Sequence, residues 1–130
     1  MAPPRIKFDP SSLVPAVRQI EDSLRILLVD GQLAPGTSLP SVRRLAMELG
    51  VHFNTVAEAY RLLASEGWLE LAHGKPAVVM PRSVPPTPDA SWAEEFRERL
   101  RGLAAQLRSK GIPADQIAAE LRAVAEGISR

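Results

Sequence analysis

The chain of 130 residues has no cysteine, which excludes a disulfide scaffold, a cysteine zinc site and a thiol nucleophile. It has only two histidines, His52 and His73, which cannot form a plausible metal site by themselves. No nucleophile–base pair, phosphate-binding loop or metal-ligand cluster stands out, so neither an enzyme nor a bound cofactor is expected. No apolar run is long enough to cross a membrane, and the N-terminus lacks the apolar core of a signal peptide. A cytoplasmic protein is therefore expected.

An excess of charge of one sign is also missing. Sixteen Lys and Arg stand against 15 Asp and Glu, for a net charge of +1, and over residues 1–80 the basic and acidic side chains are equal in number. Many DNA-binding domains are visibly basic, so this balance argues weakly against DNA binding. Binding would require the basic residues to gather on one face, and useful specific affinity would require a dimer. The same balance disfavours membrane binding.

The first third of the chain predicts one helix between two irregular segments. Residues 1–12 are rich in proline, and the alternation of Ile6 and Phe8 with basic residues allows a short edge strand. Residues 14–30 carry apolar side chains at helical spacing. Glycine and proline then punctuate a loop that ends at Pro40.

Residues 39–70 predict a helix, a tight turn, a second helix and the start of a strand. Ser41 can cap the first helix with its hydroxyl, and Gly50 tolerates the left-handed conformation in which helices often end. Tyr60 falls in phase with the apolar face of the second helix, so it is predicted to be a core residue rather than a base reader. Two short helices joined by a glycine-containing turn are typical of a helix-turn-helix, whose second helix enters the major groove of DNA.

Two short strands, residues 68–71 and 77–79, follow around the turn AHGKPA and predict a wing. Trp68 is large and amphipathic, so we expect it to be buried beneath this wing. Residues 81–90 hold four prolines and predict a semi-rigid spacer between two domains.

Two amphipathic helices are predicted after the spacer. Ser91 would cap the first, with Glu94 completing a capping box, and Gly111 would end it before the second helix opens at Pro113. Two helices of this length cannot bury their apolar stripes alone, and the simplest partner is the same hairpin of a second copy. The stripes consist of Trp92, Phe96, Leu100, Leu103, Leu107, Ile117, Leu121, Val124 and Ile128.

The residues of the predicted helix-turn-helix and wing resemble the GntR family of bacterial winged helix-turn-helix repressors. The resemblance covers roughly residues 14–80 and is carried by GQLAPGTSLPSVRRLAMELGV, NTVAEAYRLLASEGWLE and the wing GWLELAHGKPAVV. The wing is similar to that of the FadR branch. The short two-helix tail and the AEAY of the second helix look like the YtrA subfamily, whose members dimerise through the tail. The resemblance implies a homodimeric transcriptional repressor on a palindromic operator.

The resemblance also implies a set of DNA-contacting positions. It places an arginine of the LPS-x-R motif at Arg43, and it puts a histidine and glycine at the wing tip. FadR-type recognition helices have arginine where Phe53 and Ala57 stand here, so the operator of that branch does not transfer. The candidate DNA-contacting residues are Arg43, Arg44, His52, Phe53, Asn54, Thr55, Arg61, His73, Gly74 and Lys75.

Several of these candidates have an ordinary structural explanation as well. Asn54 or Thr55 can cap the second helix, with or without touching DNA. Phe53 can press on a thymine methyl group or belong to the core, and Arg61 can pair with Glu58 instead of a phosphate.

The sequence thus predicts a mainly α fold with a small β-wing. A winged helix-turn-helix domain would occupy residues 1–80, a linker 81–90 and a dimerisation tail 91–130. The expected partners are double-stranded DNA and a second copy, so the protein would be associated with the nucleoid. The alternatives are a winged-helix interaction module without DNA binding, and a plasmid or phage partition or copy-control factor. The operator and any effector are not evident from the residues.

Overall fold

The computed structural model describes residues 6–81 and 89–128. The chain forms two compact units, Met1–Val84 and Pro85–Arg130. The predicted spacer at 81–90 falls mostly on residues 82–88, which lie outside those described.

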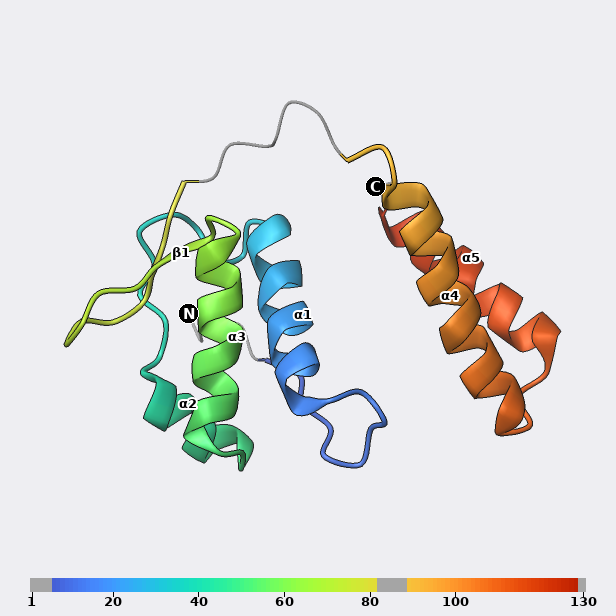
Figure 1. Cartoon of the computed structure of the whole chain (residues 1–130), viewed down its shortest axis with the longest axis horizontal. Helices are drawn as coiled ribbons and strands as arrows, with labels where there is room; N and C mark the ends of the chain where they lie inside the picture. Colours follow the sequence, from blue (N-terminus) through green and yellow to red (C-terminus); the bar gives the residue numbers. More distant parts are fainter. Residues whose placement is uncertain (1–5, 82–88, 129–130) are drawn as a thin grey trace. The chain divides into compact units, whose positions relative to one another are not determined.

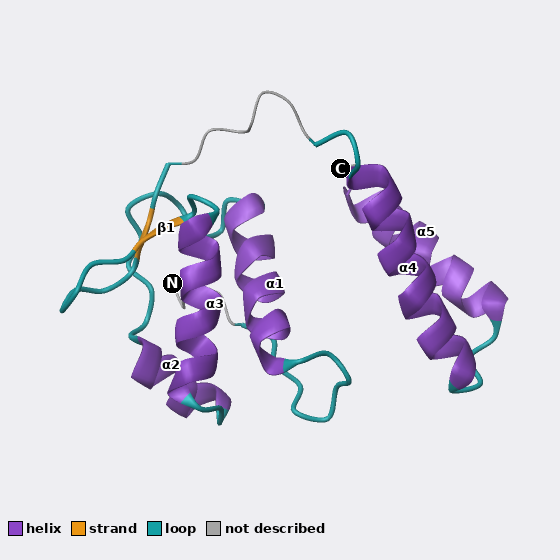
Figure 2. Cartoon of the chain, viewed as in Figure 1, coloured by secondary structure: helices purple, strands orange, loops and turns teal. Residues whose placement is uncertain are grey.

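The first unit is a three-helix cluster with a small antiparallel sheet (Figures 1 and 2). Its elements are α1 (Ala16–Val29), α2 (Val42–Leu49), α3 (Phe53–Ser65), β1 (Leu69–Glu70) and β2 (Val78–Val79). Helix α3 is the centre of the unit, because α1 lies along one side of it and α2 packs near its start (Figure 1).

The core of this unit is made by apolar side chains that recur at helical spacing, as the sequence predicts. Ile20 of α1 and Val56 and Leu63 of α3 are fully buried. Removing side chains of this size from water stabilises a fold by about 1.5–3 kcal/mol each. Among the described residues, no charged or polar side chain is buried in this core except that of Tyr60.

Residues 6–15 do not form the edge strand that the alternation of Ile6 and Phe8 suggested. Their backbone is instead bound by side chains of α1. Ser23 Oγ accepts from the Lys7 N–H at 3.1 Å, and Gln19 Oε1 accepts from the Asp9 N–H at 2.9 Å. Once these donors are satisfied by a helix, the segment needs no strand partner, and the strand prediction is wrong.

The loop before α2 has a role that the sequence did not suggest. The Gly36 N–H donates to Val79 O at 2.7 Å, Val79 N–H donates to Thr37 O at 2.9 Å, and Leu39 N–H donates to Ala77 O at 2.8 Å. This loop therefore forms a third backbone line beside β2, and it fixes the base of the wing to the start of α2.

The second unit is an antiparallel helical hairpin of α4 (Trp92–Ser109) and α5 (Ala114–Ile128). The predicted capping box at its start is wrong, because the Ser91 side chain makes no cap hydrogen bond. The Ser91 hydroxyl and N–H both donate to Asp89 Oδ1, at 2.8 and 2.9 Å. These two hydrogen bonds, the backbone one first, lower the pKa of Asp89 from its ordinary value.

Candidate nucleic-acid interface

The turn between α2 and α3 sets the direction in which α3 begins. Ser41 Oγ accepts from the Arg44 N–H at 3.1 Å, and Gly50 ends α2 in the left-handed conformation with φ of 71°. Val51 packs against the core, so the turn is anchored between the two helices. Both helix-end predictions at Ser41 and Gly50 are confirmed.

Helix α3 begins with an unexpected cap. His52 is the capping residue, and its Nδ1 accepts from the Asn54 N–H at 3.1 Å. The alternative in which Asn54 or Thr55 caps the helix is wrong, since both lie inside it. The Asn54 side chain is exposed and that of Thr55 is half-buried.

Phe53 lies at the surface rather than in the core, with 43% of its area exposed. Its ring stacks on that of His52 with centroids 4.6 Å apart. The Arg43 guanidinium carbon lies 5.5 Å from the centroid of the same ring. The core alternative for Phe53 is therefore wrong, and three candidate residues meet at the start of α3.

Arg44, in contrast, forms an ion pair with Glu48. Its Nε lies 3.1 Å from Glu48 Oε1, one turn further along α2, and both side chains are largely exposed. Exposed pairs of this spacing contribute only about 0.3–0.5 kcal/mol, so Arg44 remains able to exchange Glu48 for another anion.

The wing tip carries the remaining candidates. His73, Gly74 and Lys75 are all exposed. Gly74 has φ of 74°, and the Lys75 N–H donates to Ala72 O at 3.1 Å, which closes the turn. A side chain at position 74 would be strained in this conformation, so glycine suits the turn whether or not DNA approaches it.

A groove of about 760 Å³ separates the wing from the helices. Arg61 of α3 lines one side of it, and His73, Gly74 and Lys75 line the other. Within the described part of the chain, no ion pair involves Arg61, so the alternative pairing with Glu58 is not observed. The groove brings together Arg61 and the wing tip, while Asn54 is not part of its lining.

Tyr60 forms part of the floor of this groove. It is buried, as the sequence predicts, and its hydroxyl donates to Pro40 O at 2.7 Å. Burial, and then the negative charge of Glu48, raise the pKa of Tyr60 above its ordinary value. The hydroxyl therefore keeps its proton and its hydrogen bond to a higher pH than that of an exposed tyrosine.

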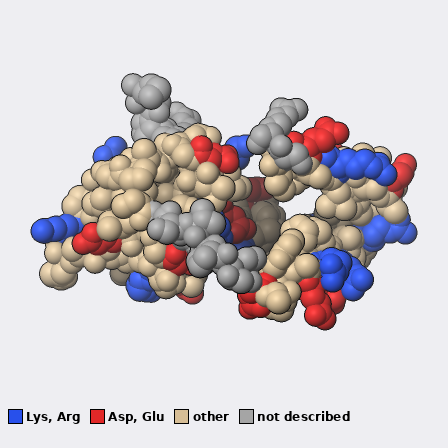
Figure 3. Space-filling model, turned by 90° about the horizontal axis from the view of Figure 1, so that it is seen from above, with Lys and Arg blue, Asp and Glu red and all other residues tan. Residues whose placement is uncertain are grey.

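The charges around these residues are mixed rather than uniformly basic. Figure 3 shows Lys and Arg scattered among Asp and Glu on the face it presents, within each unit. Glu66 is engaged away from the wing, because its carboxylate accepts from Arg25 Nη2 at 2.6 Å and Arg25 Nε at 3.2 Å. No cluster of residues suited to a metal ion occurs over 6–81 and 89–128. No helix in these ranges is long and apolar enough to span a membrane.

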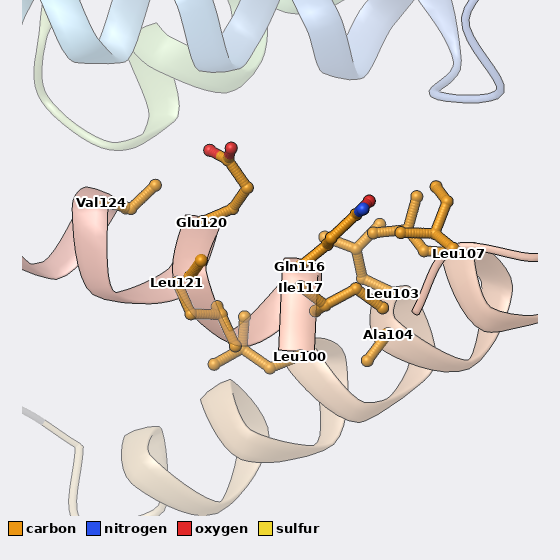
Figure 4. A pocket seen from close by; sticks show the side chains of 11 residues that line it. Leu100, Leu103, Ala104, Leu107, Gln116, Ile117, Glu120, Leu121 and Val124 are labelled. Atoms are coloured by element: carbon orange, nitrogen blue, oxygen red, sulfur yellow. The ribbon is translucent and has the colours of Figure 1, made fainter. Parts of the chain in front are cut away.

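The helical hairpin presents a second candidate surface. None of the described residues of α4 and α5 is buried. Leu100 of α4 and Ile117 and Leu121 of α5 turn toward one another along an apolar groove of about 450 Å³ (Figure 4). The structure brings six of the nine predicted dimerisation residues into its lining, namely Leu100, Leu103, Leu107, Ile117, Leu121 and Val124.

The other three predicted dimerisation residues lie outside this groove. Trp92 and Phe96 contact each other near the start of α4 with ring centroids 6.3 Å apart, and 56% and 53% of their areas are exposed. Ile128, at the end of α5, is 76% exposed. The apolar stripe thus extends beyond the groove at both helices.

Comparison with known proteins shows to which family this chain belongs. The model of the bacterial regulatory proteins of the gntR family matches residues 16–79. YtrA from Sulfolobus acidocaldarius, a GntR-family transcription factor of known structure, is 33% identical. The match covers 96% of this chain and all of that one, with a TM-score of 0.54. The chain belongs to the gntR family.

Two further proteins are similar over about half of this chain. The transcriptional repressor YtrA of Bacillus subtilis is 40% identical over 70 residues, which are 54% of either chain. This chain thus spans about half the length of that curated relative. The DNA-binding domain of AraR, solved in complex with an operator, is 24% identical over 56% of this chain with a TM-score of 0.50, and it shows the fold alone.

These matches confirm the predicted family and its YtrA-like character. Sequence reasoning missed the histidine cap, the contact between Arg43 and Phe53 and the pairing of the 36–39 loop with β2. The first had a signal, because His52 directly precedes the helical period and histidine has a ring nitrogen that can accept. The other two depend on residues that come together only after the chain folds.

Proposed function

We propose that this gntR-family chain is a sequence-specific DNA-binding transcriptional regulator, which acts as a homodimeric repressor on a palindromic operator in the cytoplasm. One observation carries the proposal. The exposed start of α3 and the exposed wing tip belong to the same compact unit, and the lining of the groove contains Arg61 of α3 and Lys75 of the wing.

The groove has one basic side chain from α3, Arg61, and one from the wing, Lys75, for the phosphates of a DNA strand. The start of α3 would enter the major groove, as recognition helices do, and the wing tip would lie in or beside the adjacent minor groove. The phosphates between the two grooves would then pass Arg61 on one side and Lys75 on the other. Backbone contacts of this kind set register, while Arg43 and Asn54 supply donors for base edges.

The small number of basic side chains explains why a single copy is not sufficient. The first unit of each copy offers only a few basic side chains to phosphates, so the electrostatic part of binding is modest. Two copies on two half-sites double these contacts, and twofold symmetry of the protein matches a palindrome.

The side chains of the α4–α5 hairpin support the proposal that a second copy of the chain covers its apolar groove. Its apolar side chains are half-exposed in one chain, and its outer positions carry pairs such as Arg99–Glu95 and Arg101–Glu98, with N–O distances of 2.8 and 3.4 Å. A hairpin with an apolar inner face and a charged outer face pairs with its own copy into a four-helix bundle. Such a role involves no catalytic chemistry.

The first experiment selects bound sequences from a random DNA duplex library and then measures fluorescence anisotropy on the enriched duplex and on a scrambled one. Each titration is done at two salt concentrations. We expect enrichment of a palindromic sequence, selective affinity for it, and binding that weakens as salt rises. Equal and negligible binding to both duplexes would overturn the proposal in favour of an interaction module.

The dimer is tested separately by sedimentation over a range of protein concentrations without DNA. We expect a mass of two chains at micromolar concentration. A monomer at every concentration, with palindromic DNA still bound cooperatively, would place dimerisation on the DNA rather than in solution.

A further inference from the structure

Three exposed side chains from the start of α2 and the start of α3 meet at the surface. Arg43 comes from the first turn of α2, His52 caps α3, and Phe53 is the first residue of α3. The Phe53 ring is the common element, because it stacks on the imidazole at 4.6 Å and has the Arg43 guanidinium carbon 5.5 Å from its centroid.

The surroundings of Phe53 explain why an apolar ring stays at the surface. It is outside the apolar core and 43% exposed, so core burial does not account for its position. The face of an aromatic ring attracts a cation within about 6 Å, and a guanidinium can also stack on it. The ring therefore gives Arg43 a platform that a smaller aliphatic side chain would not provide.

Arg43 has no competing partner in the described part of the chain. Its neighbour Arg44 is bound to Glu48, whereas no ion pair involves Arg43 over residues 6–81 and 89–128. A long side chain without such a partner loses much rotamer freedom when it binds DNA. A platform that already holds the guanidinium near one place lowers that loss.

His52 adds a second donor to the same cluster. Because its Nδ1 accepts from the Asn54 N–H at 3.1 Å, the neutral ring carries its proton on Nε2. The cluster thus offers guanidinium N–H groups and one imidazole N–H. This donor set fits the acceptor edge of guanine, O6 and N7, with a neighbouring phosphate.

We propose that Phe53 is a positioning residue for base recognition, which holds the Arg43 guanidinium for one base pair in each half-site. Phe53 acts through Arg43 and does not itself read the base. The inference rests on the proposed function, and it concerns how the DNA-reading arginine is held rather than whether the chain binds DNA.

The test compares the wild type with Phe53→Leu, Phe53→Tyr, Arg43→Ala and the double variant Phe53→Leu/Arg43→Ala. Each is titrated on the selected operator, on all its single-base variants and on a scrambled duplex. We expect Phe53→Leu to weaken operator binding about two- to fivefold and to reduce discrimination at the base pair that Arg43→Ala also affects. Phe53→Tyr keeps the ring and should retain wild-type discrimination.

The double variant separates a positioning role from a direct one. If Phe53 acts only through Arg43, the double variant binds like Arg43→Ala alone. Affinity for the scrambled duplex and the thermal unfolding midpoint should be the same in Phe53→Leu and the wild type, since the ring is exposed.

A second measurement needs no DNA. A guanidinium held over a ring has its neighbouring side-chain protons shifted upfield, so the Arg43 Cδ proton resonances should move toward ordinary values in Phe53→Leu and stay in Phe53→Tyr. Unchanged resonances would overturn the inference, as would equal discrimination by Phe53→Leu and the wild type. Loss at a different base pair from that of Arg43→Ala would show direct reading by Phe53. A wild type that selects no DNA sequence would overturn the proposed function itself.

Discussion

The hydroxyl of Tyr60 donates a 2.7 Å hydrogen bond to the carbonyl oxygen of Pro40, 20 residues earlier in the chain. This bond connects the middle of α3 to the residue that precedes the α2 cap. It also lies beneath the groove between the wing and the helices. The placement of α2 against α3 therefore depends partly on one hydrogen bond of a buried tyrosine.

Tyr60→Phe removes the hydroxyl and leaves the Pro40 carbonyl without its partner. The free energy of unfolding should fall by about 0.5–1.5 kcal/mol, as is usual for one such bond. Urea unfolding followed by circular dichroism measures the change. Tyr60→Phe with wild-type stability would show that the bond contributes nothing net.

The pH dependence of stability should also change in this variant. The pKa of Tyr60 is raised in the folded state from an ordinary value of 10.0. The unfolded chain then loses this proton first, so stability is complete below pH 10 and declines as pH rises beyond it. Between about pH 8 and about pH 11 the wild type should lose more stability than Tyr60→Phe. Parallel curves would contradict the shift.

Arg25 joins α1 to the end of α3, with Nη2 2.6 Å from Glu66 and 2.7 Å from Glu21. The hydrogen bond to Glu66, ahead of that to Glu21, raises the pKa of Arg25, so it remains charged. Arg25→Ala should destabilise the first unit by about 1 kcal/mol, since a bidentate pair in a network exceeds an isolated surface pair. Thermal unfolding measures it. Arg44→Ala, which breaks only the exposed pair with Glu48, is the matched control and should cost less.

Arg43→Ala should weaken binding to the selected operator by about 1–3 kcal/mol and relax the preference at one base pair. Anisotropy on the operator and its base variants measures both. Arg44→Ala changes the adjacent residue of the same helix and should affect all duplexes alike. Unchanged operator affinity in Arg43→Ala would remove this residue from the interface.

Lys75→Ala should weaken binding to every duplex to a similar extent and reduce the salt slope by about one, because it removes one phosphate contact. Binding constants over a series of salt concentrations give the slope. Arg101→Ala removes an equal charge from the outer side of α4 and should leave the slope as it is. A loss of sequence preference in Lys75→Ala would instead mean that the wing tip reads bases.

Phe96→Lys combined with Leu103→Lys should dissociate the dimer, weakening association by roughly a hundredfold or more, because an unpaired ammonium in an apolar interface costs several kcal/mol. Sedimentation of the variant measures this. Glu98→Lys adds a lysine at the outer Arg101–Glu98 pair and should remain dimeric. If the double variant stays dimeric, the interface lies elsewhere.

The sequence by itself determined the helices, their order and the family, because each follows from local patterns: apolar spacing, capping residues, glycines and a contiguous motif. It also placed Tyr60 in the core and the wing after α3. The roles of the candidate DNA-contacting and dimerisation residues stay predictions.

Only the tertiary structure decided which partners the surface side chains take. Arg43 and Arg44 are adjacent and alike in the sequence, yet one lies over Phe53 and the other pairs with Glu48. The pairing of the 36–39 loop with β2 is also an outcome of folding. Such contacts depend on how the turn and the wing orient separate segments, and residue spacing along the chain does not encode that orientation.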